Sequence, residues 1–264
     1  MVEKTAGYDY KELGEFETFK KIVEKLRSPD GCPWDRKQTH DSLKQYLVEE
    51  CYEVLETIDE NTPSALGEEL GDLWLQIMLH TQIAEERGEF VMEDVIRQIN
   101  SKLVHRHPHV FGDAKAIDAC EASLNWQELK GREKPENQSI LSGVPKNLPA
   151  LAYSQSIQRR AAAVGFDWKE LDDVIGKLTE EIEELRQADS QEKRVEEFGD
   201  ILFTLCNVAR HMDIELESAL RQTNARFSRR FNHIEERCRK KGTDLRSLSL
   251  EEMDALWNEA KTAE

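Results

Sequence analysis

The sequence predicts an all-α protein built from two similar modules in tandem, each of a four-helix type. Strand signals are weak, and long stretches carry apolar residues at helical spacing. In residues 41–60, the apolar face consists of Leu43, Tyr46, Leu47, Val54, Leu55 and Ile58. Only 7 prolines and 13 glycines interrupt the 264 residues, as is typical of helix-rich globular proteins.

A duplication follows from four sequence landmarks that recur in the same order in both halves. "VEECYEVL" (48–55) pairs with "TEEIEELR" (179–186), and "LGEELGDLWLQ" (66–76) pairs with "RVEEFGDILFT" (194–204). "NSKLVHRH" (100–107) and "WQELK" (126–130) pair with "NARFSRRF" (224–231) and "WNEAK" (257–261). One match between acidic helices is explained by chance, but four in order indicate a repeated unit of about 100 residues.

Proline and glycine mark the expected boundaries between modules. They cluster at 28–33, 107–112 and 131–149, and the last of these segments has the composition of a linker. We therefore expect a first module over 15–130, a linker over 131–150 and a second module over 151–264.

The charge of the chain limits its partners. With 53 acidic and 36 basic residues, the formal net charge is −17. Such a chain repels nucleic acid and anionic membranes, so we expect neither as a partner. A phosphorylated ligand remains compatible with this charge, because a bound metal ion reverses the local field.

The cysteines and apolar segments favour a cytoplasmic protein. Five cysteines are scattered without a CxxC pair, which disfavours a disulfide scaffold or a zinc ribbon. The first residues lack the apolar core of a signal peptide. The longest apolar run, "LWLQIMLH" (73–80), is too short to span a bilayer.

Each half carries a pair of carboxylates on each of two successive helices, in the order ExxE, turn, ExxD. Residues three apart share a helix face. The short connection predicts that the two helices pack antiparallel and bring the four carboxylates together. The two sets are Glu50, Glu53, Glu69 and Asp72, and Glu181, Glu184, Glu197 and Asp200.

Apolar runs directly after Asp72 and Asp200 predict that these carboxylates lie at the edge of a core. Converging acids there raise one another's pKa, a conflict that a divalent cation relieves. Oxygen ligands without histidine favour Mg²⁺, or Mn²⁺ in its place, over zinc. The alternatives are a solvated acidic face and a di-iron bundle, but the latter requires ExxH motifs that neither half supplies.

Basic residues recur with the carboxylates, as a phosphate ligand would require. The candidates are Asn100, Lys102 and Arg106 in the first half and Asn224, Arg226, Arg229 and Arg230 in the second. Ion pairing with surface acids is the alternative. Trp126 follows the first basic segment and Trp257 follows the second. Each of them either stacks on a base or packs in the core. His105, His107 and His109 are interpreted as turn or core histidines rather than metal ligands.

At these residues the chain closely resembles the MazG family of nucleoside triphosphate pyrophosphohydrolases. The resemblance rests on "GCPWD", "EECYEVL", "EELGDLWLQ", "KLVHRHPHVFGD" and "NWQELKGREK", then on "AAAVGFDW", "KLTEEIEEL", "EEFGDILF" and "NARFSRRF". It covers nearly the whole chain beyond about residue 14. The ExxE…ExxD pattern alone is typical of the wider all-α NTP pyrophosphatase superfamily, which includes dimeric dUTPases.

The resemblance implies a homodimer that converts an NTP or dNTP to the monophosphate and pyrophosphate with Mg²⁺. It assigns the metal to Glu181, Glu184, Glu197 and Asp200 in the second module, which is the better established catalytic one in the family. Lys177, Arg226 and Arg230 would contact phosphates and Trp257 the nucleotide, with Glu196, Asn224 and Arg229 as further substrate contacts. Glu180 or Glu181 is the candidate base for the attacking water.

The first module keeps its four carboxylates and Lys102, Arg106 and Trp126, with Glu49 placed behind the metal ligands or as a base. It departs where "HRHPHVF" replaces "RRFNHIE", which puts equal activity in doubt. A nucleotide-binding regulatory module and a pure interaction bundle therefore compete with the enzyme hypothesis. Base preference stays open, because an aromatic ring stacks on any base.

Overall fold

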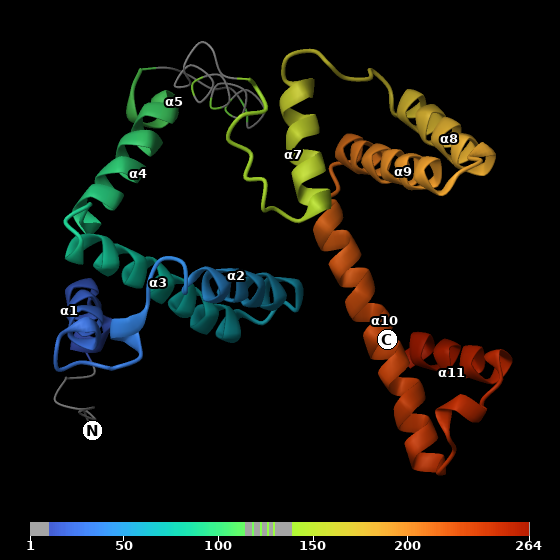
Figure 1. Ribbon diagram of the computed structural model, residues 1–264, viewed down its shortest axis with the longest axis horizontal. Coiled ribbons are helices and arrows are strands. Elements are labelled where there is room, and N and C mark those ends of the chain that lie inside the picture. Colours follow the sequence, from blue (N-terminus) through green and yellow to red (C-terminus); the bar gives the residue numbers. More distant parts are fainter. Residues whose placement is uncertain are drawn as a thin grey trace. The chain divides into compact units, whose positions relative to one another are not determined.

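The computed structural model describes residues 11–113, 118, 122, 126, 129 and 139–263, and every regular element among them is a helix (Figure 1). The predicted all-α class is confirmed. The chain divides into two compact units, Met1–Glu133 and Lys134–Glu264. No helix of the described residues has both the length and the apolar character needed to cross a membrane.

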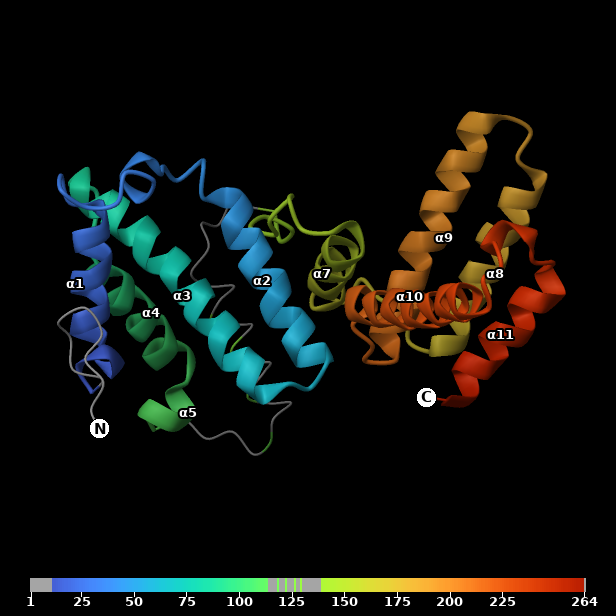
Figure 2. The same cartoon turned by 90° about the horizontal axis from the view of Figure 1, so that it is seen from below.

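The first unit is organised around the helix pair α2 (Lys44–Asp59) and α3 (Pro63–Glu86), which pack side by side (Figure 2). Helix α1 (Phe16–Arg27) and helix α4 (Met92–Arg106) both pack against α3. Short helices η1 (Glu12–Gly14), η2 (Asp35–Lys37) and α5 (Pro108–Phe111) complete the described part. The core consists of Val23, Leu43, Met78, Leu79, Ile83 and Met92.

Local sequence explains the ends of these helices. Asn61 adopts a left-handed backbone conformation (φ 54°) in the turn between α2 and α3, as a short polar side chain tolerates. Pro63 then opens α3, where its missing N–H costs nothing. Helix α4 ends at Arg106 because Pro108 disfavours helical geometry at His107.

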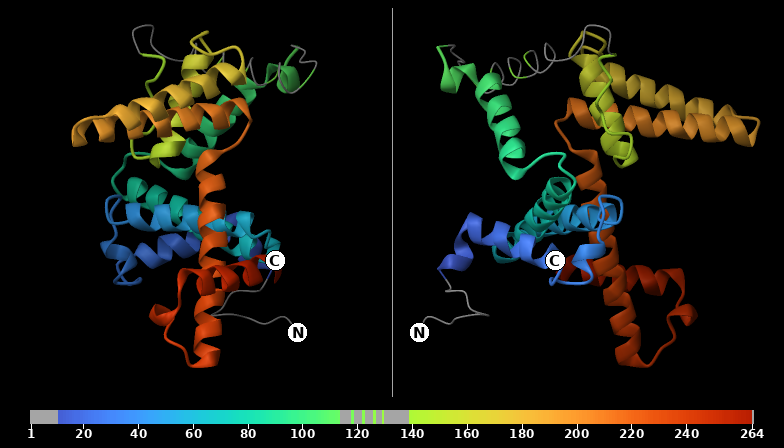
Figure 3. Two further views of the ribbon diagram at one scale, coloured as in Figure 1. Left: turned by 90° about the vertical axis from the view of Figure 1, so that its right-hand side faces the viewer. Right: turned by 60° about the vertical axis from the view of Figure 1, so that its left-hand side comes forward.

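The second unit repeats this plan. Helices α8 (Leu171–Gln187) and α9 (Gln191–His211) form the pair, and α7 (Ala150–Ala162) packs on α9. Helix α10 (Leu216–Lys241) runs from the end of α9 away from the pair, and α11 (Leu250–Ala263) folds back along it after η3 (Leu245–Ser247) (Figures 1 and 3). Buried Gln158 donates to the Phe203 carbonyl at 2.8 Å and so ties α7 to α9.

A pair of cation–π contacts shows the internal repeat in three dimensions. The Arg106 guanidinium lies 5.4 Å from the ring centre of Trp126, and the Arg230 guanidinium lies 5.4 Å from that of Trp257. The units differ where α10 continues for 26 residues and α4 for only 15. The His107-Pro108 break in the first unit causes this difference.

One expectation about burial is wrong. The apolar runs after Asp72 and Asp200 are only half covered: Trp74 is 45% exposed, Phe203 is 42% exposed, and both aspartates are exposed. Each helix pair buries the face toward α1 or α7. In the described residues, much of the other apolar surface of the pair stays open to solvent.

Candidate metal and nucleotide site

The first carboxylate cluster joins the middle of α2 to the first half of α3. Glu50, Glu69 and Asp72 each offer an oxygen, and these three oxygens lie within 4.8 Å of one another. Two helices joined by a three-residue turn place these residues opposite each other, as their spacing predicted. The geometry can hold a small divalent cation with oxygen ligands.

Electrostatics at this cluster are unfavourable without a cation. Partial burial raises the pKa of Glu50, and the charges of Asp72 and Glu53 raise it further. The pKa of Glu69 is raised by partial desolvation and then by Glu53 and Asp72. Glu53 is thus close enough to act on both carboxylates, although it lies outside the closest set of three.

The second cluster is its counterpart on α8 and α9. Glu181, Glu184 and Glu197 offer oxygens within 4.8 Å of one another. Partial desolvation, followed by the charges of Glu184 and Glu181, raises the pKa of Glu197, and Asp200 adds to this effect. Glu181 is buried, at 5% exposure, whereas Glu184 and Asp200 face solvent.

A lysine is bound to the second cluster. The Lys177 ammonium lies 2.7 Å from an oxygen of Glu181 and 2.9 Å from an oxygen of Glu180. These contacts, to Glu181 first, raise the pKa of Lys177 well above its ordinary value. The spacing of three and four residues on one helix was the sequence signal for this contact.

The first cluster has a different partner, which the sequence did not reveal. The side-chain amide of Gln76 donates to Glu50 at 3.5 Å, and Gln76 is buried. The two residues are separated by 26 positions on different helices, so no local pattern pointed to the contact. Tyr46 occupies the position equivalent to Lys177, with its ring edge-on to Trp34 at 5.7 Å.

The predicted phosphate contacts lie on other helices. Asn224, Arg226 and Arg229 are exposed on α10, where Arg226 donates to the Thr223 hydroxyl at 2.8 Å. Arg230 lies over Trp257, and Glu196 is exposed on α9. Helix α10 packs on α7 and α11, so a role of its arginines at the carboxylates stays a prediction.

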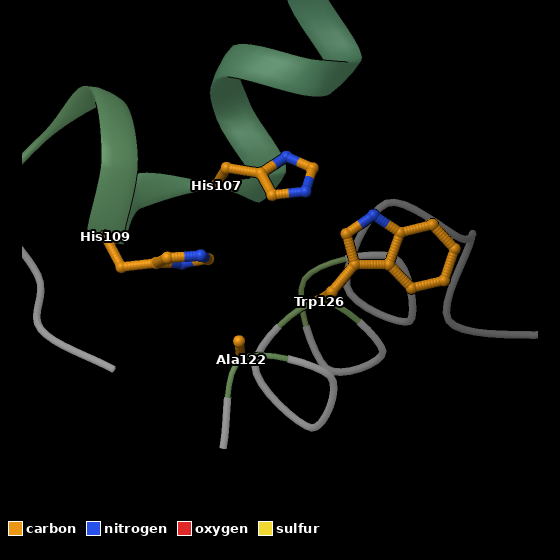
Figure 4. A pocket seen from close by; sticks show the side chains of 4 residues that line it. All are labelled: His107, His109, Ala122 and Trp126. Atoms are coloured by element: carbon orange, nitrogen blue, oxygen red, sulfur yellow. The ribbon is translucent and has the colours of Figure 1, made fainter. Parts of the chain in front are cut away.

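In the first unit, Asn100 and Lys102 are exposed on α4, and Glu49 is exposed on α2 with a 2.7 Å hydrogen bond from Gln45. A hollow of about 310 Å³ beside Arg106 and Trp126 is lined by His107, His109, Ala122 and Trp126 (Figure 4). His107 lies at the junction of α4 and α5, with Nδ1 2.7 Å from the Leu103 carbonyl oxygen. This position agrees with the interpretation as a turn histidine.

Comparison with known proteins agrees with this arrangement. Residues 38–111 match the family described as the MazG nucleotide pyrophosphohydrolase domain. Residues 154–227 match the family described as phosphoribosyl-ATP pyrophosphohydrolase. Each matched segment contains one carboxylate cluster.

Relatives cover nearly the whole chain. The nucleoside triphosphate pyrophosphohydrolase/pyrophosphatase MazG of Thermotoga maritima is 47% identical over 93% of this chain and 95% of its own length. The nucleoside triphosphate pyrophosphohydrolase of Escherichia coli K12 is 41% identical over 92% of this chain and 95% of its own. YabN of Bacillus subtilis is 51% identical over 95% of this chain, which spans 52% of that protein. The chain therefore belongs to the MazG family of nucleoside triphosphate pyrophosphohydrolases.

Proposed function

We propose that this chain is a nucleoside triphosphate pyrophosphohydrolase that cleaves NTPs and dNTPs to the monophosphate and pyrophosphate, with Mg²⁺ as its cofactor and Mn²⁺ as a substitute. The observation that carries the proposal is the pair of carboxylate clusters, one in each unit, on helices that match pyrophosphohydrolase families. A role in clearing or controlling the nucleotide pool follows from this activity. The scattered cysteines suit a reducing compartment, and we place the enzyme in the cytoplasm.

The chemistry of the clusters fits a magnesium ion. Each cluster offers three carboxylate oxygens within 4.8 Å of one another, and Mg²⁺ prefers oxygen ligands. The pKa values of Glu50 and Glu197 are raised by partial desolvation first and then by neighbouring carboxylates, and a cation relieves the repulsion between these charges. In the second module the ligands would be Glu181, Glu184, Glu197 and Asp200. Mg²⁺ held by these residues would neutralise charge on the triphosphate and polarise its α-phosphorus.

The chain's own residues supply the remaining steps. Glu180 or Glu181 accepts the proton of the water that attacks the α-phosphorus. Lys177, which contacts both carboxylates in the metal-free protein, contacts the triphosphate when the cation and the nucleotide are bound. Arg226 and Arg230 neutralise the leaving pyrophosphate, and Trp257 stacks on the base, where an aromatic ring contributes about 1–3 kcal/mol.

We also propose that the enzyme is a homodimer that pairs the α8/α9 helices of two copies. Exposed apolar side chains follow these helices, among them Ile175, Ile182, Val195 and Leu202. Covering such a face with its own copy yields a four-helix bundle. Such pairing also brings the carboxylates of one copy within reach of the arginines of the other.

Light scattering after size exclusion tests the dimer. We expect twice the 30.5 kDa mass of the chain for the wild type and the monomer mass for Val195→Glu. Leu250→Glu, on α11 and 78% exposed, is the matched control and should remain dimeric. A monomeric wild type, or a Val195→Glu variant that stays dimeric, contradicts the proposed interface.

A second candidate function concerns the first module alone. Tyr46 in place of the lysine and the early end of α4 favour a nucleotide-binding regulatory role without turnover. Glu50→Gln with Asp72→Asn should then change the nucleotide dependence of the rate and leave turnover in place. Loss of all turnover in this variant would assign catalysis to the first module.

Product analysis tests the main proposal. Digestion of a panel of NTPs and dNTPs with Mg²⁺ should give monophosphate and pyrophosphate in equal amounts. Glu184→Gln or Asp200→Asn should abolish this turnover while the helical circular dichroism spectrum is kept. Diphosphate and inorganic phosphate as products would refute the proposed reaction.

A further inference from the structure

The second carboxylate cluster holds a cation of the protein itself. The Lys177 ammonium lies 2.7 Å from an oxygen of Glu181, which is 5% exposed and belongs to the proposed metal-binding set. Its second contact, to Glu180 at 2.9 Å, anchors the same ammonium from outside that set. A divalent cation that takes this oxygen of Glu181 must therefore displace a positive charge.

In the part of the chain that the structure describes, no protein cation competes for the first cluster. Tyr46 stands at the position of Lys177, and Glu50 instead receives a 3.5 Å hydrogen bond from the neutral amide of Gln76. Gln76 is 6% exposed, and its side-chain oxygen has no hydrogen-bond partner among the residues that the structure describes. Among the described residues, no lysine or arginine forms an ion pair with Glu50, Glu53, Glu69 or Asp72.

We propose that Lys177 is a resident counter-ion that weakens divalent-cation binding at the second cluster, so that the first cluster binds the cation more tightly in the absence of nucleotide. This inference rests on the proposed metal-binding role of both clusters. It assigns different loading behaviour to two clusters whose four carboxylates occupy equivalent positions in the sequence repeat. The residue four positions before Glu181 or Glu50, lysine in the second cluster and tyrosine in the first, decides the difference.

The two sites then respond differently to substrate. The first cluster takes up its cation whether or not a nucleotide is present. At the second cluster, an incoming triphosphate adds negative charge beside Lys177 and gives the ammonium a new partner. Cation and nucleotide therefore bind the second cluster with positive coupling, which the first cluster lacks.

Mn²⁺ is titrated into the full chain, and the EPR signal of the free ion reports how much is bound. This measures the affinity of each cluster independently of activity. Asp72→Asn and Asp200→Asn each remove a ligand from one cluster and so assign the two binding constants. Lys177→Met should tighten Mn²⁺ binding at the second cluster about fivefold, as expected for the loss of a partly exposed ion pair. Tyr46→Lys should weaken binding at the first cluster by a similar factor.

Lys240→Met is the matched control, because Lys240 forms an ion pair of the same i,i+4 spacing with Glu236 on α10. It should leave both constants unchanged, and circular dichroism checks that each variant is folded. Equal affinities of the two clusters, with no response to Lys177→Met or Tyr46→Lys, overturn this inference and leave the proposed function intact. Absence of Mn²⁺ binding at both clusters overturns both.

Discussion

Neutralising Glu50 should stabilise the metal-free protein and at the same time remove its response to metal. Glu50 has oxygens of Glu69 and Asp72 within 4.8 Å, and two unit charges about 4 Å apart repel by about 1 kcal/mol in bulk water. Exposure and salt reduce this repulsion, so we expect a gain of about 0.5–1 kcal/mol for Glu50→Gln. For a chain of this size, that corresponds to about 1–3 °C in the denaturation midpoint.

Differential scanning calorimetry in EDTA and then in MgCl₂ measures both effects. In EDTA, Glu50→Gln should denature above the wild type. In MgCl₂ the order should reverse, because the wild type gains binding free energy that the variant lacks. Glu24→Gln, an exposed position on α1, is the control and should follow the wild type in both buffers. A variant that is less stable in EDTA, or equal gains from Mg²⁺ in both proteins, would refute the reasoning.

The pH dependence of the same pair has a definite sign. The pKa of Glu50 is raised in the folded state by burial and by Asp72, so its ionisation costs stability. The protonated form of Glu50 avoids this cost. Its stabilising contribution is fully present below the ordinary pKa of about 4.3 and is lost as the pH rises through the raised value. The advantage of Glu50→Gln in EDTA should therefore be largest near neutral pH and vanish in acid. An advantage that persists at low pH would have another cause.

Three further predictions concern other parts of the chain. Arg27→Met should cost about 2–3 kcal/mol in urea unfolding, since it removes the guanidinium that bonds Glu86 at 2.7 and 2.8 Å and the Gln38 carbonyl. An unchanged midpoint would contradict the role of this ion pair. Trp257→Leu should raise KM for nucleotide about tenfold with kcat nearly unchanged, because it removes the ring that stacks on the base. An equal effect of Trp126→Leu would contradict the assignment of catalysis to the second module. Asp167→Asn should destabilise the second unit by about 1–3 kcal/mol, because Asp167 accepts hydrogen bonds from Arg210 and His211 ahead of α8; calorimetry that shows no loss would remove Asp167 as an anchor of that loop.

Helical periodicity and local spacing predicted much of this molecule. The turn at Asn61 and Pro63 is short, so the antiparallel pairing of α2 with α3 followed from sequence, as did the meeting of Glu50 with Glu69. Lys177 and Glu181 are four residues apart on one helix, so their ion pair has a local signature, although the family resemblance assigned Lys177 to phosphate instead. The repeat placed a tryptophan after each basic segment, but the contacts of Arg106 with Trp126 and of Arg230 with Trp257 were not predicted.

What sequence did not predict depends on contacts between distant segments. The run after Asp72 indicated burial, but an apolar pattern does not say what covers it, and Trp74 is half exposed. Arg27 and Glu86 are 59 residues apart, and Gln76 meets Glu50 across two helices, so neither contact has a local signature. Module boundaries at 130 and 150 and the roles of the individual site residues stay predictions.

The position of an ¹⁸O label in the products tests most directly the central claim that water attacks the α-phosphorus. Hydrolysis of a nucleoside triphosphate in H₂¹⁸O places the label on whichever phosphorus water attacks. Attack at the α-phosphorus, beside the second carboxylate cluster, predicts ¹⁸O in the monophosphate and unlabelled pyrophosphate by mass spectrometry. Label in the pyrophosphate would show attack at the β-phosphorus and contradict the account.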